Sequence, residues 1–199
     1  MIAITVNYNT PDLVKRMIDS FRKFNDTKIV IIDGSDTREY EKLKTIDFVN
    51  TEIIHFSGNI HHGPGMAWAF TNVDSDKILV LDSDVIIHRE FVSILESRLK
   101  TWQYGIGDIQ TVDRDGWNVA TGIKYLHPAC MLVNRDIVLQ WPLPIKHGAP
   151  MIETMKAINE KGREGLLNYC PEVDTKIHNG IYITHNWMGT VKRTGGYHL

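Results

Sequence analysis

The sequence has few cysteines, no long apolar segment and no excess of basic residues. Its 199 residues include only Cys130 and Cys170, too few for a disulfide framework, so we expect a reducing compartment, the cytoplasm. No apolar run approaches the roughly 20 residues that a membrane-spanning helix needs, and the first residues lack the pattern of a signal peptide. The formal net charge of −2 comes without a basic stripe, which argues against nucleic acid as a partner.

The remaining composition is that of an ordinary globular protein. Hydrophobic residues make up 43% of the chain and charged residues 23%. This length is enough for a sizeable core, and neither repeats nor low-complexity segments divide the sequence. We therefore expect a single domain over residues 1–199.

The first hundred residues alternate apolar strands with helical patterns. Thr10 and Pro11 form a helix start, as N-cap and first helical position. The expected strands are 2–6, 28–32, 52–56 and 77–81, and the expected helices are 11–24, 38–43, 66–72 and 90–99. This order predicts an α/β fold with a mostly parallel central sheet and helices on both faces.

Beyond residue 101 the pattern changes to a small mixed β region. The Asp115-Gly116 pair is a hairpin-turn signal between two strands. The expected strands are 105–112, 117–123, 129–133 and 181–184, with helices over 135–140 and 151–161.

Polar residues follow three of the predicted strands. Asn7, Asp33 and Asp82 stand at strand ends, and the carboxyl ends of parallel strands face one ligand-binding crevice. Asp82 and Asp84 end an uninterrupted apolar run, where ionised carboxylates need water, a cation or hydrogen-bond donors. Two other Asp-x-Asp pairs occur, at Asp74/Asp76 and Asp113/Asp115, but neither follows a buried strand. The sequence therefore predicts a cation and a phosphorylated ligand at Asp82 and Asp84.

In this order, four segments resemble the GT-A nucleotide-sugar glycosyltransferases of the family 2 type. They are Val6–Leu13, the Ile31-Ile32-Asp33-Gly34-Ser35 loop, the His61–Ala67 glycine-bearing loop and Asp82-Ser83-Asp84, which is similar to the metal-binding DXD motif. The resemblance implies a Rossmann-like GT-A domain. Residues 1–100 would be its nucleotide-sugar-binding half, and residues 101–199 its acceptor-binding half.

The resemblance also implies roles for individual residues on the donor side. Asp84 would hold Mn²⁺ or Mg²⁺ with Asp82, which could instead contact the ribose, and His185 would be a further metal ligand. A divalent cation stabilises the charge on a departing diphosphate. The base would be bound by Asp33 and framed by further nucleotide-binding residues, namely Val6, Tyr8, Asn9 and Gly65. The donor would be a UDP-, GDP- or TDP-sugar. Lys192 and Arg193 would close over the diphosphate, or belong to a solvated tail.

On the acceptor side the resemblance implies an inverting transfer to a glycan or another hydroxyl group. Such a transfer needs a base beside that hydroxyl. Glu153 occupies the position where family members carry a Glu-Asp pair, so it is the candidate base. An acidic residue in a first helical turn also simply complements the helix dipole. His147 and Asp174 are substitutes. Adjacent His61 and His62 are not expected to form a metal site, because neighbours on a strand point to opposite faces.

Two other functions remain open at this stage. A GT-A fold could bind a nucleotide or glycan without catalysing transfer. A phosphatase of the haloacid dehalogenase type also carries Asp-x-Asp after an apolar strand, although that family opens on this strand and three strands precede it here.

Overall fold

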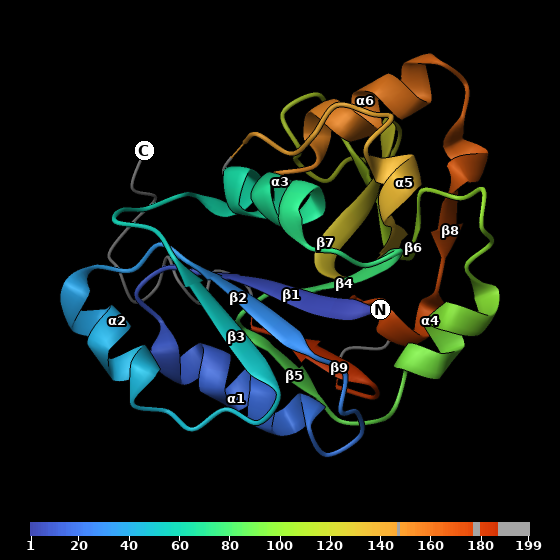
Figure 1. The fold of residues 1–199 in the computed structure, drawn as a ribbon. Coiled ribbons are helices and arrows are strands. Elements are labelled where there is room, and N and C mark those ends of the chain that lie inside the picture. The colour runs from blue at the N-terminus through green and yellow to red at the C-terminus, as the bar shows by residue number, and fades with distance from the viewer. Residues whose placement is uncertain (147, 177–179, 187–199) are drawn as a thin grey trace.

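The computed structural model describes residues 1–146, 148–176 and 180–186. Its principal feature is a seven-stranded sheet in the order β3-β2-β1-β4-β7-β6-β8, and a second sheet pairs β5 with β9 (Figure 1). The strands are β1 (Ile2–Asn7), β2 (Ile29–Asp33), β3 (Thr51–His55), β4 (Lys77–Leu81), β5 (Val85–Ile87), β6 (Gly105–Val112), β7 (Ile123–Asn134), β8 (Leu167–Tyr169) and β9 (Ile183–His185).

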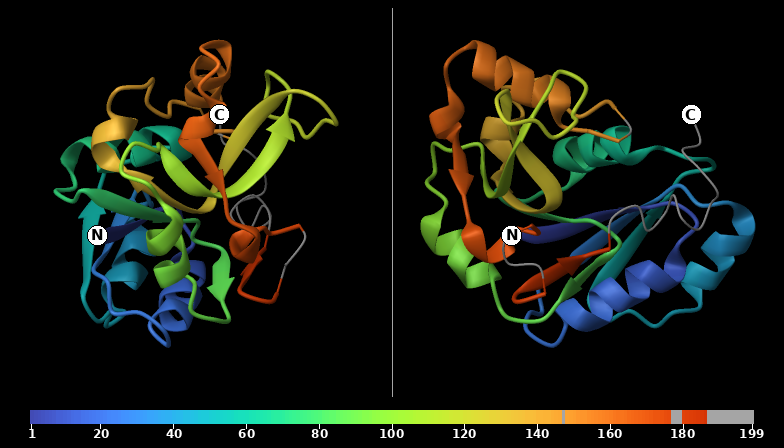
Figure 2. Two further views of the ribbon diagram at one scale, coloured as in Figure 1. Left: turned by 90° about the vertical axis from the view of Figure 1, so that its right-hand side faces the viewer. Right: turned by 180° about the vertical axis from the view of Figure 1, so that it is seen from behind.

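Helices cover both faces of the large sheet. Helices α1 and α2 lie against one face, while α3, α5 and α6 lie over the other (Figures 1 and 2). The helices are α1 (Pro11–Phe21), α2 (Thr37–Lys44), α3 (His62–Asn72), α4 (Val92–Arg98), α5 (Arg135–Val138) and α6 (Ile152–Glu160), with short 3₁₀ turns at Glu164–Leu166 and Pro171–Val173. No helix in this described part of the chain is long and apolar enough to cross a membrane.

The apolar runs of the strands explain this arrangement. Successive side chains of a strand point to opposite faces. Accordingly Ile31 and Leu79 pack in the core on the α1 side, whereas Ile32 and Val80 pack in the core on the α3 side. Strands β1 to β4 pair in parallel, and β7 pairs antiparallel with both β4 and β6. The predicted α/β fold with a mostly parallel sheet is confirmed.

Several observed strands depart from the predicted ones. The strand predicted over 117–123 is wrong, because Asp113 Oδ1 accepts hydrogen bonds from the backbone N–H groups of Asp115 and Trp117, and only the isolated bridge Val112–Asn118 forms. The strand predicted over 129–133 is the end of the longer β7. Strands β5 and β8, of three residues each, were not predicted.

Candidate active site

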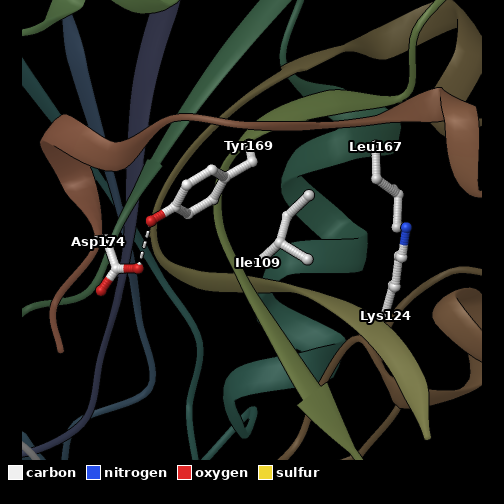
Figure 3. Close-up of a pocket in the computed structure, with 5 residues that line it drawn as sticks. All are labelled: Ile109, Lys124, Leu167, Tyr169 and Asp174. Carbon is white, nitrogen blue, oxygen red and sulfur yellow. Dashed lines mark hydrogen bonds between the residues drawn. The ribbon is translucent and has the colours of Figure 1, made fainter. Parts of the chain in front are cut away.

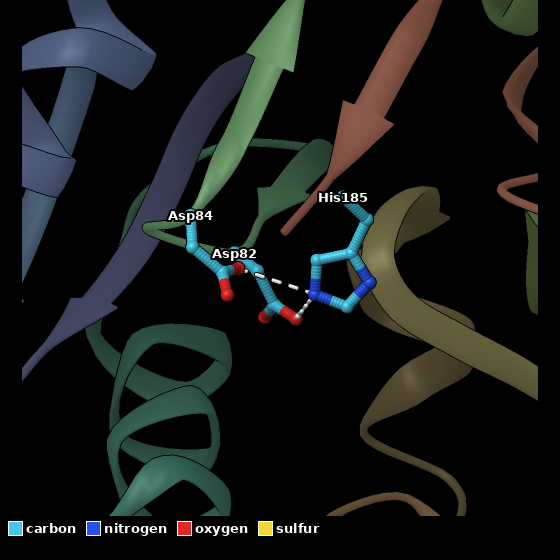
Figure 4. A group of neighbouring side chains, drawn as sticks. All are labelled: Asp82, Asp84 and His185. Carbon is cyan, nitrogen blue, oxygen red and sulfur yellow. Dashed lines mark ion pairs between the residues drawn. The ribbon is translucent and has the colours of Figure 1, made fainter. Parts of the chain in front are cut away.

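Asp82 and Asp84 lie in the short connection between the end of β4 and the start of β5. The backbone N–H of Asp82 still bonds to Ala129 of β7, and Val85 then enters the small sheet opposite His185. The β5–β9 pair therefore brings His185 from the far end of the chain to the acid pair. Its Nε2 lies 3.1 Å from Asp84 Oδ1 and 3.4 Å from Asp82 Oδ2. Figure 4 shows both carboxylates pointing toward this imidazole.

His62 is a second imidazole at this cluster, although the adjacent His61 and His62 were not expected to form a metal site. Residues 62 to 72 form α3, so the helix starts earlier than predicted and His62 occupies its first turn. Its Nε2 lies 3.2 Å from Asp82 Oδ1. The argument from strand geometry fails here, because His61 has a positive φ of 61° and the chain then turns into a helix.

Charge dominates this cluster. Burial by itself would raise the pKa of Asp82, but His62 and His185 together hold that pKa well below its usual range. Burial opposes protonation of His185 as well, yet the two carboxylates raise the pKa of His185 to about 10. The acid pair is thus balanced by imidazolium charge, which a bound divalent cation would replace.

His127 is a third histidine at the site that sequence reasoning missed. Its ring centroid lies 5.7 Å from that of His185. The β6–β7 pairing jumps from Gly107↔Met131 to Ile109↔Leu126, so residues between Leu126 and Met131 bulge out of the ladder and carry His127 with them. Burial lowers the pKa of His127 to about 3, and its Nδ1 accepts the N–H of Ala129, so this imidazole is neutral.

Asp84, Asp82 and His185 fit a divalent metal. Their ligand atoms all lie within 4.8 Å of one another. Two carboxylates and an imidazole form a mixed oxygen and nitrogen donor set, which suits Mn²⁺, and Mg²⁺ would rely on the oxygens alone. These are the three residues that the sequence put forward as metal ligands.

Asp33 lies at the end of β2 and is fully buried, with an exposed fraction of 0%. Its Oδ1 accepts hydrogen bonds from Asn7 Nδ2 at 2.7 Å and from Ser35 Oγ at 2.6 Å. Its Oδ2 lies 2.8 Å from His55 Nδ1. Asn7 in turn accepts a hydrogen bond from Thr10, whose hydroxyl therefore does not cap α1. The predicted base-binding carboxylate is already surrounded by side chains of its own protein.

The turn after β1 is tied to the turn after β2. Asn9 has a positive φ of 55°. Its N–H donates to Ser35 Oγ, and its side-chain oxygen accepts from the N–H of Asp36. Tyr8 lies between these anchors and is half-buried. These hydrogen bonds fix the two turns to each other, and with them the residues that were predicted to frame a nucleotide base.

Val6 and Gly65 are in contact with each other. A Cβ added at Gly65 would lie 2.8 Å from Val6 Cγ1, so only glycine lets α3 approach the end of β1 this closely. This packing fixes the first turn of α3, and with it His62, beside β4.

The candidate base Glu153 lies in the first turn of α6, as predicted. Its Oε1 lies 3.0 Å from Lys156 Nζ and 3.3 Å from Lys146 Nζ. The bond from Lys156 and then that from Lys146 lower the pKa of Glu153. Of the other predicted residues, His147, Lys192 and Arg193 lie outside the described part of the chain.

The substitute base Asp174 is one wall of a pocket of about 380 Å³ in the second half. The pocket lies between β6, β7 and β8 and is lined by Ile109, Lys124, Leu167, Tyr169 and Asp174 (Figure 3). Tyr169 donates its hydroxyl to Asp174 Oδ2 at 2.7 Å.

Comparison with known sequences identifies the family. The profile described as glycosyl transferase family 2 matches residues 2–160. The chain therefore belongs to glycosyl transferase family 2, and the resemblance seen in the sequence is confirmed. This membership argues against the phosphatase alternative. A search of curated protein sequences returns no match.

Solved structures of the same fold are similar to the chain. A mannosyltransferase from Pyrobaculum calidifontis in complex with GDP-Man and Mn²⁺ matches with a TM-score of 0.63 and 12% identity, over 87% of this chain and 55% of that one. Glucosyl-3-phosphoglycerate synthase from Mycobacterium tuberculosis in complex with UDP matches with a TM-score of 0.62 and 13% identity, over 85% of this chain and 69% of that one. These likenesses confirm the GT-A fold, and the chain spans little more than half of the mannosyltransferase.

Proposed function

We propose that the chain is a metal-dependent glycosyltransferase that moves a sugar from a nucleoside-diphosphate donor to a hydroxyl group of an acceptor. The observation that carries this proposal is the meeting of Asp82, Asp84 and His185 at the carboxyl end of β4, in a chain that belongs to glycosyl transferase family 2. The domain would span residues 1–199. Its cytoplasmic location stays a prediction from the sequence.

In this proposal the end of β4 binds the metal and the diphosphate of the donor, and the turns after β1 and β2 bind its nucleoside. Asp84, Asp82 and His185 would hold Mn²⁺ or Mg²⁺, which when bound neutralises charge on the departing diphosphate. His185 would have to give up its proton to become a ligand, while His62 would stay beside Asp82, with Nε2 3.2 Å from Asp82 Oδ1. The turns around Tyr8 and Asn9, fixed by Ser35, supply a frame for the nucleoside. The two structural neighbours were solved with GDP-Man and with UDP, which supports a nucleotide donor of this kind.

The acceptor would bind in the second half of the chain. The pocket at Tyr169 combines apolar side chains with a phenol, a carboxylate and a lysine, a mixture that suits the hydroxyl groups and apolar faces of a sugar ring. A glycan is therefore the acceptor class that we favour.

A screen for donor consumption tests the proposed function. The chain is incubated separately with UDP-, GDP- and TDP-sugars, with Mn²⁺ and with a chelator, and release of the nucleoside diphosphate is followed. We expect turnover of at least one donor that depends on the metal. If no nucleotide sugar is consumed or bound under any of these conditions, the proposal is wrong.

A non-catalytic binding module remains the second candidate, favoured by one observation. Two lysines neutralise Glu153, and a carboxylate so engaged is a weak base. If Glu153 is nevertheless the base of an inverting transfer, Glu153→Gln should lower turnover about 10²–10⁴-fold and leave donor binding unchanged. Glu160→Gln, an exposed position on the same helix, is the matched control. Equal turnover of both variants would remove Glu153 from the mechanism.

A further inference from the structure

A ligand at the ends of β2 and β3 would meet His55 before it met Asp33. Asp33 is fully buried and accepts three hydrogen bonds from its own protein, whereas the side chain of its neighbour His55 is 24% exposed. His55 is the last residue of β3 and lies directly opposite Asp33 in the β2–β3 register. His55 is thus the solvent-facing end of a hydrogen-bonded pair that begins at Asp33.

The ring of His55 is held firmly in place. It stacks on Tyr40 of α2 with ring centroids 3.6 Å apart and an angle of 6° between the planes. The ammonium of Lys44 lies over the same tyrosine ring, 4.8 Å from its centroid. The hydrogen bond between His55 Nδ1 and Asp33 Oδ2 further restricts rotation of the imidazole ring. A histidine with this support presents Nε2 in one orientation.

The hydrogen bond to Asp33 also sets the tautomer. Because Asp33 accepts from Asn7 and Ser35, it acts as a carboxylate acceptor toward His55 too, and Nδ1 must carry the hydrogen. A neutral imidazole then has a bare Nε2, which is a hydrogen-bond acceptor. Uracil, thymine and guanine carry a ring N–H on their Watson–Crick edge, whereas adenine and cytosine have a bare ring nitrogen there.

The position of His55 in the sheet suits a nucleoside diphosphate whose phosphates lie at the acid pair. Strand β3 is three places from β4 in the order β3-β2-β1-β4. Neighbouring strands lie about 4.8 Å apart, so the two strand ends are separated by roughly 14 Å. This separation is comparable to the distance between the diphosphate and the base edge of an extended nucleoside diphosphate.

We propose that His55, oriented by Asp33 and Tyr40, is the residue that recognises the base, and that it selects bases with a ring N–H, namely uracil, thymine or guanine. The proposal rests on the proposed function, because it assigns a specificity to that donor site. Asp33 then becomes a positioning residue that sets the tautomer of His55.

Calorimetric titration with UDP, TDP, GDP, CDP and ADP in the presence of MnCl₂ tests this assignment. We expect the unmodified chain to bind at least one of UDP, TDP and GDP tenfold or more tightly than CDP and ADP. His55→Ala should lose this discrimination, while His88→Ala, at an exposed histidine elsewhere, should keep it.

The substitution Asp33→Asn gives the sharper result. Its amide oxygen can still accept from Asn7 and Ser35, but its NH₂ group would donate to His55 Nδ1 and move the ring hydrogen to Nε2. The preference should then reverse toward CDP or ADP, which a merely structural role of Asp33 would not produce. If the unmodified chain binds nucleotides and both variants keep its preference, this inference is overturned and the proposed function stands. If the unmodified chain binds none of the five nucleotides, both fall together.

Discussion

The ends of β2 and β4 both carry buried carboxylates, but the protein satisfies them in different ways. Asp33 at the end of β2 is bonded by an amide, a hydroxyl and one imidazole that is stacked on a tyrosine. Asp82 and Asp84, after β4, are approached at Nε2 by His62 and His185, whose charge depends on protonation. Hydrogen bonds hold the carboxylate of Asp33 in place, whereas the charges of Asp82 and Asp84 are balanced by neighbouring imidazoles.

This difference would separate two tasks of the proposed donor site. Hydrogen bonds from fixed donors hold a shape, which is what discrimination between bases needs. When the charge of a carboxylate pair is balanced by protons on neighbouring imidazoles, a cation can replace those protons while the surrounding side chains keep their places. The comparison predicts that changes at β4 act on chemistry and metal binding, whereas changes at β2 act on stability and selectivity.

The largest expected effect is that of Asp84→Asn on turnover. The variant removes one carboxylate charge from the predicted metal site and keeps the side-chain shape. We expect metal-dependent turnover to fall by about 10³-fold, as when a group that stabilises transition-state charge is removed. Donor consumption with Mn²⁺ measures this loss. Asp115→Asn, at an exposed position of another Asp-x-Asp pair, is the control. An equal loss of turnover in the two variants would mean that the acids at the end of β4 have no particular role.

The effect of metal on stability should also be confined to the β4 end. A cation that binds only the folded state, at about 100 times its dissociation constant, adds about 2.7 kcal/mol to the free energy of unfolding. We expect Mn²⁺ to produce a gain of this size in the unmodified chain and in Asp33→Asn, but not in Asp84→Asn. Urea unfolding with and without MnCl₂ measures it. A metal-induced gain that survives in Asp84→Asn would place the cation elsewhere.

At the β2 end, Asn7→Ala should lower stability. Asn7 is 1% exposed and bonds Asp33, Ser35 and Thr10, so alanine leaves buried polar groups without a partner. The expected cost is about 1–3 kcal/mol in the free energy of unfolding. Urea unfolding compares it with Asn118→Ala, which removes an exposed hydrogen bond to Lys176. A cost no larger than that of the control would mean that the network at Asp33 contributes little.

The two ends also differ in how far the sequence could predict them. The apolar runs before Asp33 and Asp82 predicted the strands and placed both acids at the same side of the sheet, and the structure agrees. Asp82, Asp84 and His185 were put forward together as metal ligands, and the structure brings them together. Local patterns were sufficient for the two acids, which follow an apolar strand, whereas His185 was put forward through the resemblance to the family.

The surroundings of these acids depend on contacts that local patterns do not encode. His127 reaches the site through a bulge in β7, whose position is set by pairing with β6. His62 faces Asp82 because α3 starts at a histidine after a residue with positive φ. The contact between His55 and Asp33 depends on the register of β2 with β3. Strand pairing decided the positions of His127 and His55, and the backbone conformation at His61 decided that of His62.

The smallest expected effect concerns a carboxylate outside both strand ends, whose partner keeps its charge at every accessible pH. Arg98 donates two hydrogen bonds to Glu172, at 2.7 and 2.8 Å, and lowers the pKa of Glu172 to about 2, against an opposing effect of burial. In the unfolded chain this pKa is about 4.3. The stabilisation is therefore fully present above about pH 4.3 and is lost as the pH falls toward 2. Because Arg98 is exposed to solvent, we expect this contribution to be the smallest of those predicted here.

Urea unfolding of Glu172→Gln and the unmodified chain between pH 6 and pH 2.5 isolates this contribution. The difference in the free energy of unfolding should be constant near neutral pH and should shrink as the medium becomes acidic. Other carboxylates titrate in both proteins and cancel in the difference. A difference that does not change with pH would mean that Arg98 holds Glu172 through packing and not through charge, as neutral donors hold Asp33 at the β2 end.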